Sequence, residues 1–201
     1  MTAACSPLIV DAGGANISSL RFALGRLGCR APLSADPAQI RAASHVFLPG
    51  VGAADAAMSQ LESRGLVEVL RELRQPVLGI CLGMQLLFEA SEEGGGRNCL
   101  GVVSGRVRRL QADPEHPVPH MGWNLTSLSP DNALLAGLPA AVHFYFMHSY
   151  AAQPGPDTVA VADYGGEFAA IVSRGNFHGA QFHPERSGPA GARLLSNFLA
   201  L

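Results

Sequence analysis

Short apolar runs alternate with amphipathic segments along the first half of the chain. The apolar runs have the length of buried strands and end at turn residues; they cover 7–11, 29–33, 46–48 and 76–80. The amphipathic segments predict helices at 17–27, at 53–73 with a break near Gly65, at 82–89, and from Asp36-Pro37 onward. This alternation predicts an α/β fold with a mostly parallel, twisted sheet and helices on both faces.

The pattern changes after the glycines at 94–96. From there to Asp163 the apolar runs are short and β-like, with Pro and Gly between them; they cover 102–110, 118–121, 142–147 and 158–162. Two further runs, 168–173 and 177–181, flank Gly175-Asn176 as the strands of a hairpin would, and an amphipathic helix around Leu194 closes the chain. We expect a small antiparallel β ribbon inserted in one domain over 1–201, because no Pro- or Ser-rich linker separates a second domain.

Composition and charge exclude several classes of protein. Hydrophobic residues make up 48% of the chain and charged residues 15%, and the net charge of −2 gives no reason to expect nucleic acid or an anionic membrane as a partner. No apolar run approaches the roughly 18 residues of a membrane span, and no basic segment precedes an apolar one at the N-terminus. The four cysteines are far apart and lack metal-ligand spacing, so we expect a soluble, cytoplasmic protein without metal or cofactor.

Gly79-Ile80-Cys81-Leu82-Gly83 has the pattern of a nucleophile elbow, in which the nucleophile sits on a tight turn between a strand and a helix. The flanking glycines allow the turn to close and a substrate to approach the backbone. A helix that begins at Leu82 favours the thiolate form of Cys81, and the Leu82 amide points toward an anion that develops beside the sulfur. The alternative is a buried structural cysteine among packing glycines.

A cysteine nucleophile needs a base, and the chain has seven histidines. His183-Pro184-Glu185 is distinctive because residues two apart in an extended segment project to the same side, which brings a carboxylate to the imidazole. Glu185 would then orient the ring and stabilise the imidazolium. A surface His/Glu pair is the alternative. We expect His148 to be a core or site-lining histidine rather than a base, and the other five to be structural or on the surface.

Two further segments are candidates for substrate contact. Pro49-Gly50-Val51-Gly52 follows a predicted strand in the same half of the chain as the elbow, and one of its free amides could be a second oxyanion donor. An ordinary strand-ending turn is the alternative. Gln85 lies one helical turn from Cys81 and could hydrogen-bond a polar substrate, although its position alone is that of an ordinary helix residue.

Together these motifs resemble those of the class I (triad) glutamine amidotransferases. The resemblance rests on 79–85, 179–185 and 48–52, and it covers nearly the whole chain in order. Two segments, 119–124 and 145–150, are most similar to those of the glutaminase subunits of imidazole glycerol phosphate synthases, enzymes of histidine biosynthesis. The resemblance implies the flavodoxin-like glutamine amidotransferase fold.

For the site, the resemblance implies a triad of Cys81, His183 and Glu185 that hydrolyses glutamine to glutamate and ammonia through a Cys81 thioester. The other implied contacts are the oxyanion amides of Val51 and Leu82 and the glutamine-binding groups of Gly50, Gly52, Gln85, Ser149 and Tyr150. The implied partner in a heterodimer is a separate (β/α)8 cyclase subunit, since a barrel of about 250 residues does not fit in this chain. That partner would use the ammonia to make imidazole glycerol phosphate and an aminoimidazole carboxamide ribotide.

Three residues are expected at the partner interface: Asn16, Trp123 and Arg186. The segment 11–16 lacks the tyrosine that usually follows its aspartate in the family, and Arg186 replaces the usual lysine. The chain has no lysine, so drift under coding bias explains Arg186 better than altered function. Core packing is the alternative for Trp123. For the whole chain the alternatives are a glutaminase subunit of another amidotransferase, a stand-alone γ-glutamyl hydrolase and a non-catalytic binding module.

Overall fold

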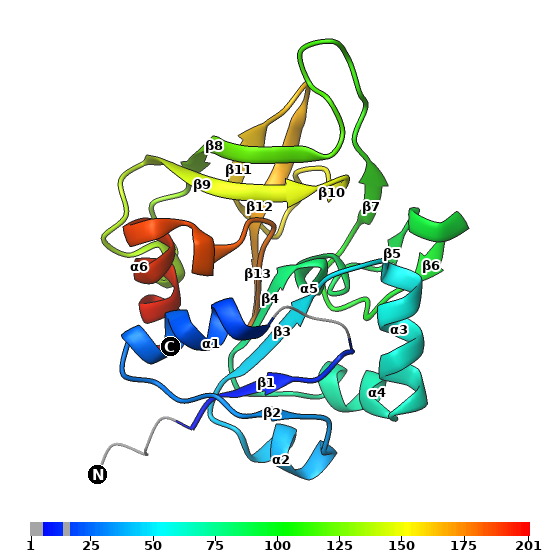
Figure 1. Ribbon diagram of the computed structural model, residues 1–201, viewed down its shortest axis with the longest axis vertical. Coiled ribbons are helices and arrows are strands. Elements are labelled where there is room, and N and C mark those ends of the chain that lie inside the picture. Colours follow the sequence, from blue (N-terminus) through cyan, green and yellow to red (C-terminus); the bar gives the residue numbers. More distant parts are fainter. Residues whose placement is uncertain (1–5, 14–16) are drawn as a thin grey trace.

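The computed structural model describes residues 6–13 and 17–201, and one large sheet runs through this part of the chain (Figure 1). Its nine strands lie in the order β2-β1-β3-β4-β13-β12-β11-β8-β9. The first five in that order pair in parallel and the later pairs are antiparallel. The strands are β1 Leu8–Val10, β2 Leu33–Ser34, β3 Val46–Gly50, β4 Val77–Cys81, β8 His120–Leu128, β9 Ala141–His148, β11 Thr158–Asp163, β12 Glu167–Arg174 and β13 Phe177–Ala180.

A second sheet of four short strands has the order β10-β7-β5-β6, and its strands are β5 Ala90–Ser91, β6 Arg97–Asn98, β7 Arg106–Arg109 and β10 Tyr150–Ala152. The α-helices are α1 Ile17–Arg26, α2 Pro37–Ala42, α3 Ala54–Ser63, α4 Leu66–Arg71, α5 Leu82–Gln85 and α6 Gly188–Phe198. Three 3-10 turns are η1 Glu93–Gly95, η2 Ala133–Leu135 and η3 Pro184–Arg186. Strands β5 and β6 lie next to α3, away from α1 and α6 (Figure 1).

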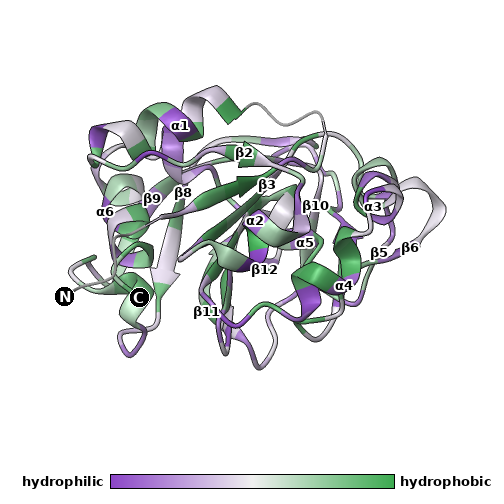
Figure 2. Cartoon of the chain, turned by 90° about the horizontal axis from the view of Figure 1, so that it is seen from below, coloured by the Kyte–Doolittle hydropathy of each residue, from purple (hydrophilic) through white to green (hydrophobic). Residues whose placement is uncertain are grey.

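The parallel part of the sheet has an apolar cluster on each face. Strand β3 shows the division, because its successive side chains point to opposite faces. Leu48 belongs to the cluster that contains Leu61 of α3, whereas Phe47 belongs to the cluster that contains Phe198 of α6. Phe47 and Phe198 meet edge to face with ring centroids 5.0 Å apart. Figure 2 shows the apolar β3 between α1 and α6 on one side and α3 and α4 on the other, which is the two-sided cover that the alternating pattern predicts.

Several local signals are confirmed. Asp36 caps α2 through a hydrogen bond from the Ala38 amide at 2.8 Å, with Pro37 in the first helical turn. Gly65, at φ +65°, separates α3 from α4 where the break was predicted. The runs on either side of Gly175-Asn176 pair as the antiparallel hairpin β12–β13. The α/β class with a largely parallel core is therefore confirmed.

Two predictions close to Cys81 were wrong. Pro49 and Gly50 do not interrupt the strand, because β3 stays in parallel register with β4 until Gly50 lies opposite Cys81. The helix after Cys81 ends at Gln85 rather than at residue 89. The Leu87 amide bonds to Met84 O at 3.0 Å, a three-residue spacing that tightens the chain into a turn.

The antiparallel part is larger than a small ribbon. The run expected at 118–121 begins the nine-residue strand β8, and β8, β9, β11 and β12 extend the main sheet instead of forming a separate ribbon. Polar residues on one face of β8 interrupt the apolar pattern, so the sequence predicted a shorter strand. The run 29–33 contributes only Leu33 to β2. One domain over 1–201 stays a prediction. Within residues 6–13 and 17–201 no helix is long and apolar enough to cross a membrane.

Candidate active site

Cys81 sits at the end of β4 with φ +53° and ψ −111°. Among the described residues it is the only one other than glycine with positive φ. Sterically unfavourable backbone of this kind persists where the surroundings impose it, and it is typical of a nucleophile elbow. The flanking glycines are required by contact: a Cβ on Gly79 would lie 2.6 Å from Gly83 O, and one on Gly83 would overlap the Leu48 carbonyl oxygen.

The thiol of Cys81 is buried but opens into a cavity of about 250 Å³. Its sulfur lies 3.7 Å from Met147 O and 3.9 Å from the side-chain nitrogen of Gln181. The cavity is lined by residues 50–52, Cys81, Leu82, Gln85, Glu93, Pro119, 147–150 and His183. The fold therefore brings together, around one sulfur, all the residues that the sequence assigned to substrate and oxyanion contacts.

His183 and Glu185 are paired beside this cavity. His183 Nδ1 lies 2.9 Å from Glu185 Oε1, and the two side chains are 9% and 7% exposed. The predicted reason for the pairing was wrong, because Glu185 lies in the 3-10 turn η3 rather than in an extended segment. The backbone of His183 is extended, and the 3-10 turn begins at Pro184. This change of direction brings the Glu185 carboxylate next to the His183 ring.

The protonation of His183 is set by opposing effects. Burial disfavours the charged ring, but the neighbouring Cys81 and the hydrogen bond with Glu185 outweigh it and raise the pKa of His183 to about 10. Among the described residues His183 Nε2 has no partner in hydrogen-bonding geometry. This nitrogen is therefore available to exchange a proton with the sulfur or with a substrate.

The segment that carries His183 is bound to the free edge of β9, the last strand of the sheet. The His183 amide donates to Tyr145 O at 2.9 Å. The buried hydroxyl of Ser187 accepts from the Tyr145 amide at 3.0 Å and donates to His183 O at 2.8 Å. Met147 O, next to the sulfur of Cys81, belongs to the same strand. Strand β9 thus contacts both the Cys81 sulfur and the backbone of His183.

The two expected oxyanion amides belong to neighbouring segments that both line the cavity. Leu82 is the first residue of α5, and Val51 follows β3 directly after Gly50. A Cβ on Gly50 would lie 2.9 Å from Gly83 N, so a glycine lets the two segments approach this closely.

The polar groups around Gln85 have defined partners. Gln85 Nε2 donates to Tyr150 O at 2.7 Å and to Gln181 Oε1 at 3.1 Å. Gln85 is therefore anchored through its amide nitrogen, and its side-chain oxygen is the group left for a ligand. Gln181 and Glu93 were not singled out from the sequence. Gln181 is two residues from His183, whereas Glu93 lies in an acidic, glycine-rich loop with no periodicity that marks a site.

The three expected interface residues have different positions. Asn16 lies outside the described residues. Trp123 is 57% exposed on β8, which rules out plain core packing. Arg186 is exposed and lines a smaller cavity of about 80 Å³ with Val51, Met147 and Glu185. In the described part of the chain no three His, Cys, Asp or Glu side chains are grouped to hold a metal ion.

Comparison with known proteins gives consistent results. The family Glutamine amidotransferase class-I matches residues 8–201. The imidazole glycerol phosphate synthase subunit HisH of Xanthomonas axonopodis pv. citri is 55% identical over 193 residues, which are 96% of each chain. The same subunit of Yersinia pseudotuberculosis is 49% identical over 194 residues, 96% of this chain and 98% of that one.

Two solved structures are similar over nearly the whole chain. A glutamine amidotransferase superposes with a TM-score of 0.75 at 19% identity and covers 96% of this chain and 97% of its own. PurLQS from Thermotoga maritima gives a TM-score of 0.71 at 20% identity, with 97% of each chain covered. At these identities the structural likeness concerns the fold.

Proposed function

The chain belongs to the class-I glutamine amidotransferases, and from that membership we propose that Cys81 hydrolyses glutamine and that the ammonia passes to a separate cyclase subunit. Within the family the chain is of the HisH type, the glutaminase subunit of imidazole glycerol phosphate synthase in histidine biosynthesis. The observation that carries the proposed chemistry is the strained backbone of Cys81 beside a paired histidine and glutamate. In that pair His183 Nδ1 lies 2.9 Å from Glu185 Oε1.

The first half of the reaction forms a thioester. The Cys81 thiolate attacks the side-chain carboxamide carbon of glutamine, and the carbonyl electrons move to an oxyanion that the Leu82 and Val51 amides stabilise. When this intermediate collapses, the carbon–nitrogen bond breaks and His183 Nε2 gives its proton to the departing ammonia. Glu185 holds Nδ1–H and stabilises the imidazolium before that transfer.

The second half releases glutamate. Neutral His183 takes a proton from water, the hydroxide attacks the γ-glutamyl thioester, and the Cys81 sulfur leaves as thiolate with His183 again protonated. The raised pKa of His183, about 10, means that the ring carries the proton that the first half of the reaction delivers to ammonia.

Glutamine recognition uses the rest of the cavity. Free glutamine carries an ammonium and a carboxylate, so its site needs an acceptor and a set of donors. Glu93 supplies a carboxylate to the cavity and is itself anchored by the Ala54 amide at 2.6 Å. The backbone at Ser149 and Tyr150 is the donor segment in this proposal, with Gly50 and Gly52 leaving room for the substrate and the Gln85 oxygen as a further acceptor.

An apolar face on β8 and β9 is suited to the cyclase partner. Met121, Trp123 and Leu125 follow one face of β8 and are 60%, 57% and 49% exposed. Met121 lies opposite Met147 of β9, and Trp123 lies opposite Tyr145. Large apolar side chains exposed in a contiguous row are typical of protein interfaces. The expected partner is the (β/α)8 cyclase, with Arg186 and Asn16 at the same interface. Such a heterodimer of histidine biosynthesis is expected in the cytoplasm.

Glutamine hydrolysis by the purified chain tests the subunit role. We expect low hydrolysis by the chain alone and a marked rise when the cyclase partner and its ligand are added. Full activity without any partner would instead identify a stand-alone γ-glutamyl hydrolase. Stimulation by the synthase subunit of another glutamine-dependent pathway, and not by the cyclase, would identify a different amidotransferase.

A further inference from the structure

Two buried histidines outside the triad are hydrogen-bonded to each other beside the substrate cavity. His120 lies on β8 and His148 opposite it on β9. His120 Nδ1 is 2.9 Å from His148 Nε2, and the two residues are 3% and 6% exposed. His148 also lines the cavity that contains Cys81. The proposed reaction uses neither ring, so the burial of two polar rings needs another explanation.

The hydrogen bonds allow one tautomer for each ring. His148 Nδ1 lies 2.9 Å from the Tyr150 carbonyl, so this nitrogen carries the proton and Nε2 accepts. His120 must therefore donate from Nδ1. Its Nε2 faces the Asn124 amide at 3.4 Å, and the same amide donates to Asp163 O at 2.7 Å. Each group in this series therefore donates a hydrogen bond to the next, from Asn124 through His120 and His148 to the Tyr150 carbonyl.

Burial keeps both rings neutral. It lowers the pKa of His120 to about 4 and the pKa of His148 to about 3. Around neutral pH, therefore, neither ring gains a second proton, which would turn its accepting nitrogen into a donor and break this series of hydrogen bonds.

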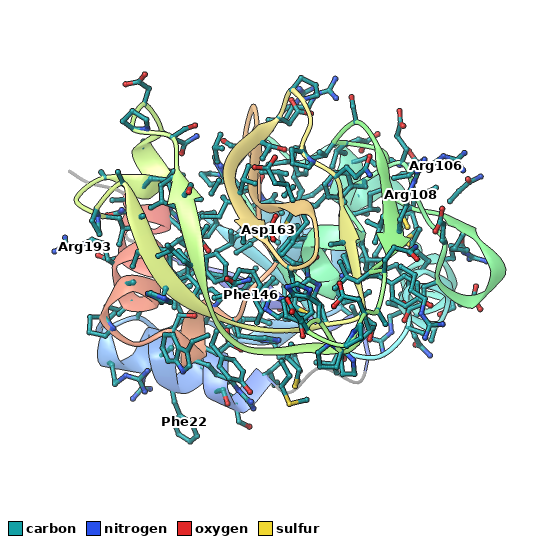
Figure 3. The ribbon with its side chains drawn as sticks, turned by 90° about the horizontal axis from the view of Figure 1, so that it is seen from above. Phe22, Arg106, Arg108, Phe146, Asp163 and Arg193 are labelled. Atoms are coloured by element: carbon teal, nitrogen blue, oxygen red, sulfur yellow. The ribbon has the colours of Figure 1, made fainter. Side chains whose placement is uncertain are left out.

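Aromatic packing fixes the plane of His120. The ring stacks on Tyr164, with centroids 3.9 Å apart and planes at 23°, and on Phe146 at 5.0 Å and 21°. Phe146 is fully buried and points inward from β9 (Figure 3). Tyr164 is held in turn by its hydroxyl, which donates to Pro117 O at 2.8 Å. His120 is consequently a rigid support for His148.

The other end of the chain of hydrogen bonds reaches the proposed substrate contacts. Tyr150 O accepts from both His148 and Gln85, which uses its two lone pairs. Gln85 donates onward to Gln181, and Gln181 lies 3.9 Å from the Cys81 sulfur. The orientation of the Gln85 amide, and so the position of its free oxygen, depends on the place of the Tyr150 carbonyl.

We propose that His148, held by His120, is a positioning residue for glutamine: it fixes the Tyr150 carbonyl and, through it, the Gln85 amide and the binding segment at 148–150. This inference rests on the proposed glutaminase function. It assigns the pair a role in substrate affinity rather than in proton transfer. The effect is therefore expected mainly in KM for glutamine, with a smaller effect in kcat.

Substitutions at His148 separate this role from core packing. The side-chain nitrogen of asparagine can replace ring Nδ1 and keep the donor to Tyr150, whereas glutamine reaches the position of Nε2 and leucine supplies neither group. In the chain with its cyclase partner, His148→Gln and His148→Leu should raise KM for glutamine about tenfold, and His148→Asn should recover most of that loss. His178→Asn is the matched control, because His178 is similarly buried and bonded to Ser173 Oγ at 2.9 Å but lies outside the cavity lining.

The outcomes distinguish failure of the proposed glutaminase function from failure of the positioning role of His148. If the wild-type chain with its partner hydrolyses no glutamine, the proposed function fails. If it does, and KM is the same in wild type and His148→Leu, or if His148→Asn behaves like His148→Leu, the positioning role is wrong. Circular dichroism checks folding. Should the His148 variants not fold, His120→Leu and His120→Asn give the same contrast, because only asparagine keeps the donor to His148 Nε2; equal KM values in the two would overturn the proposal.

Discussion

The backbone of His183 is hydrogen-bonded to that of Tyr145, at 2.9 Å, on the outer edge of the large sheet. Tyr145 lies on the strand that also presents Met147 to solvent and its carbonyl to the Cys81 sulfur. Cys81 and the backbone of His183 therefore both contact β9, and β8, which pairs with β9, carries the exposed Trp123. A partner that packs on β8 and β9 would therefore contact a strand that touches both the Cys81 sulfur and the His183 backbone.

Ser187→Ala tests the link between β9 and His183. The change removes both bonds of a buried hydroxyl, so it should lower the free energy of unfolding by about 1–3 kcal/mol. Misplacement of the histidine should lower glutamine-dependent activity about 10- to 100-fold. Urea denaturation and steady-state kinetics measure the two effects. Ser63→Ala, which removes an exposed local bond, is the control, and an equal loss of activity in both variants would contradict the link.

The raised pKa of His183 predicts a pH-dependent contribution to stability. Because the pKa rises from 6.5 to about 10 on folding, the contribution is fully present below pH 6.5 and is lost as pH rises toward 10. The difference in unfolding free energy between wild type and His183→Asn should shrink between about pH 7.5 and about 10.

His178→Asn is the control for this pH series. Burial lowers the pKa of His178 to about 4, so the ring is neutral in both states above pH 6.5 and the difference from wild type should stay flat. A flat difference for His183→Asn as well would show that the ring is not held as imidazolium.

Gly83→Ala should disrupt the elbow. A Cβ at this position overlaps the Leu48 carbonyl oxygen, so strand β3 or the turn must move. We expect a loss of at least about 3 kcal/mol in unfolding free energy and loss of glutamine hydrolysis. Gly25→Ala in α1 meets no atom within 4 Å and should stabilise the chain by about 0.5–1 kcal/mol. Thermal unfolding compares the two; equal behaviour would count against the contact.

Trp123→Ala should weaken the partner complex without changing the fold. An exposed tryptophan in the middle of an apolar row has the character of an interface hot spot, and its loss should raise Kd about 30-fold. Leu33→Ala is the matched control, because Leu33 is also exposed but lies on β2 at the opposite edge of the sheet. Calorimetric titration with the cyclase subunit measures both. An unchanged Kd for Trp123→Ala would exclude this face.

The sequence predicted those parts of the fold that local signals determine. Apolar periodicity, the Asp36 cap and the Gly65 break are each encoded within a few residues, and all three are found. The elbow was predictable for the same reason, since its glycines flank Cys81 in sequence.

The missed features depend on long-range pairing. Pro49 and Gly50 remain in a strand because β4 pairs with them, and β8 extends along a sheet whose other strands come from distant segments. The His120–His148 pair joins residues on two strands, and neither residue has a neighbour in sequence that marks it. The pairing of His183 with Glu185 was predicted from an extended segment, but a 3-10 turn produces it.

Cys81→Ala tests the central claim most directly. The variant is assayed in the complex with the cyclase partner, first with glutamine and then with free ammonia as the nitrogen source. Product formation from glutamine should disappear because no thioester can form, while product formation from ammonia should match that of the wild-type complex. Synthesis from glutamine at the wild-type rate by Cys81→Ala would contradict the account.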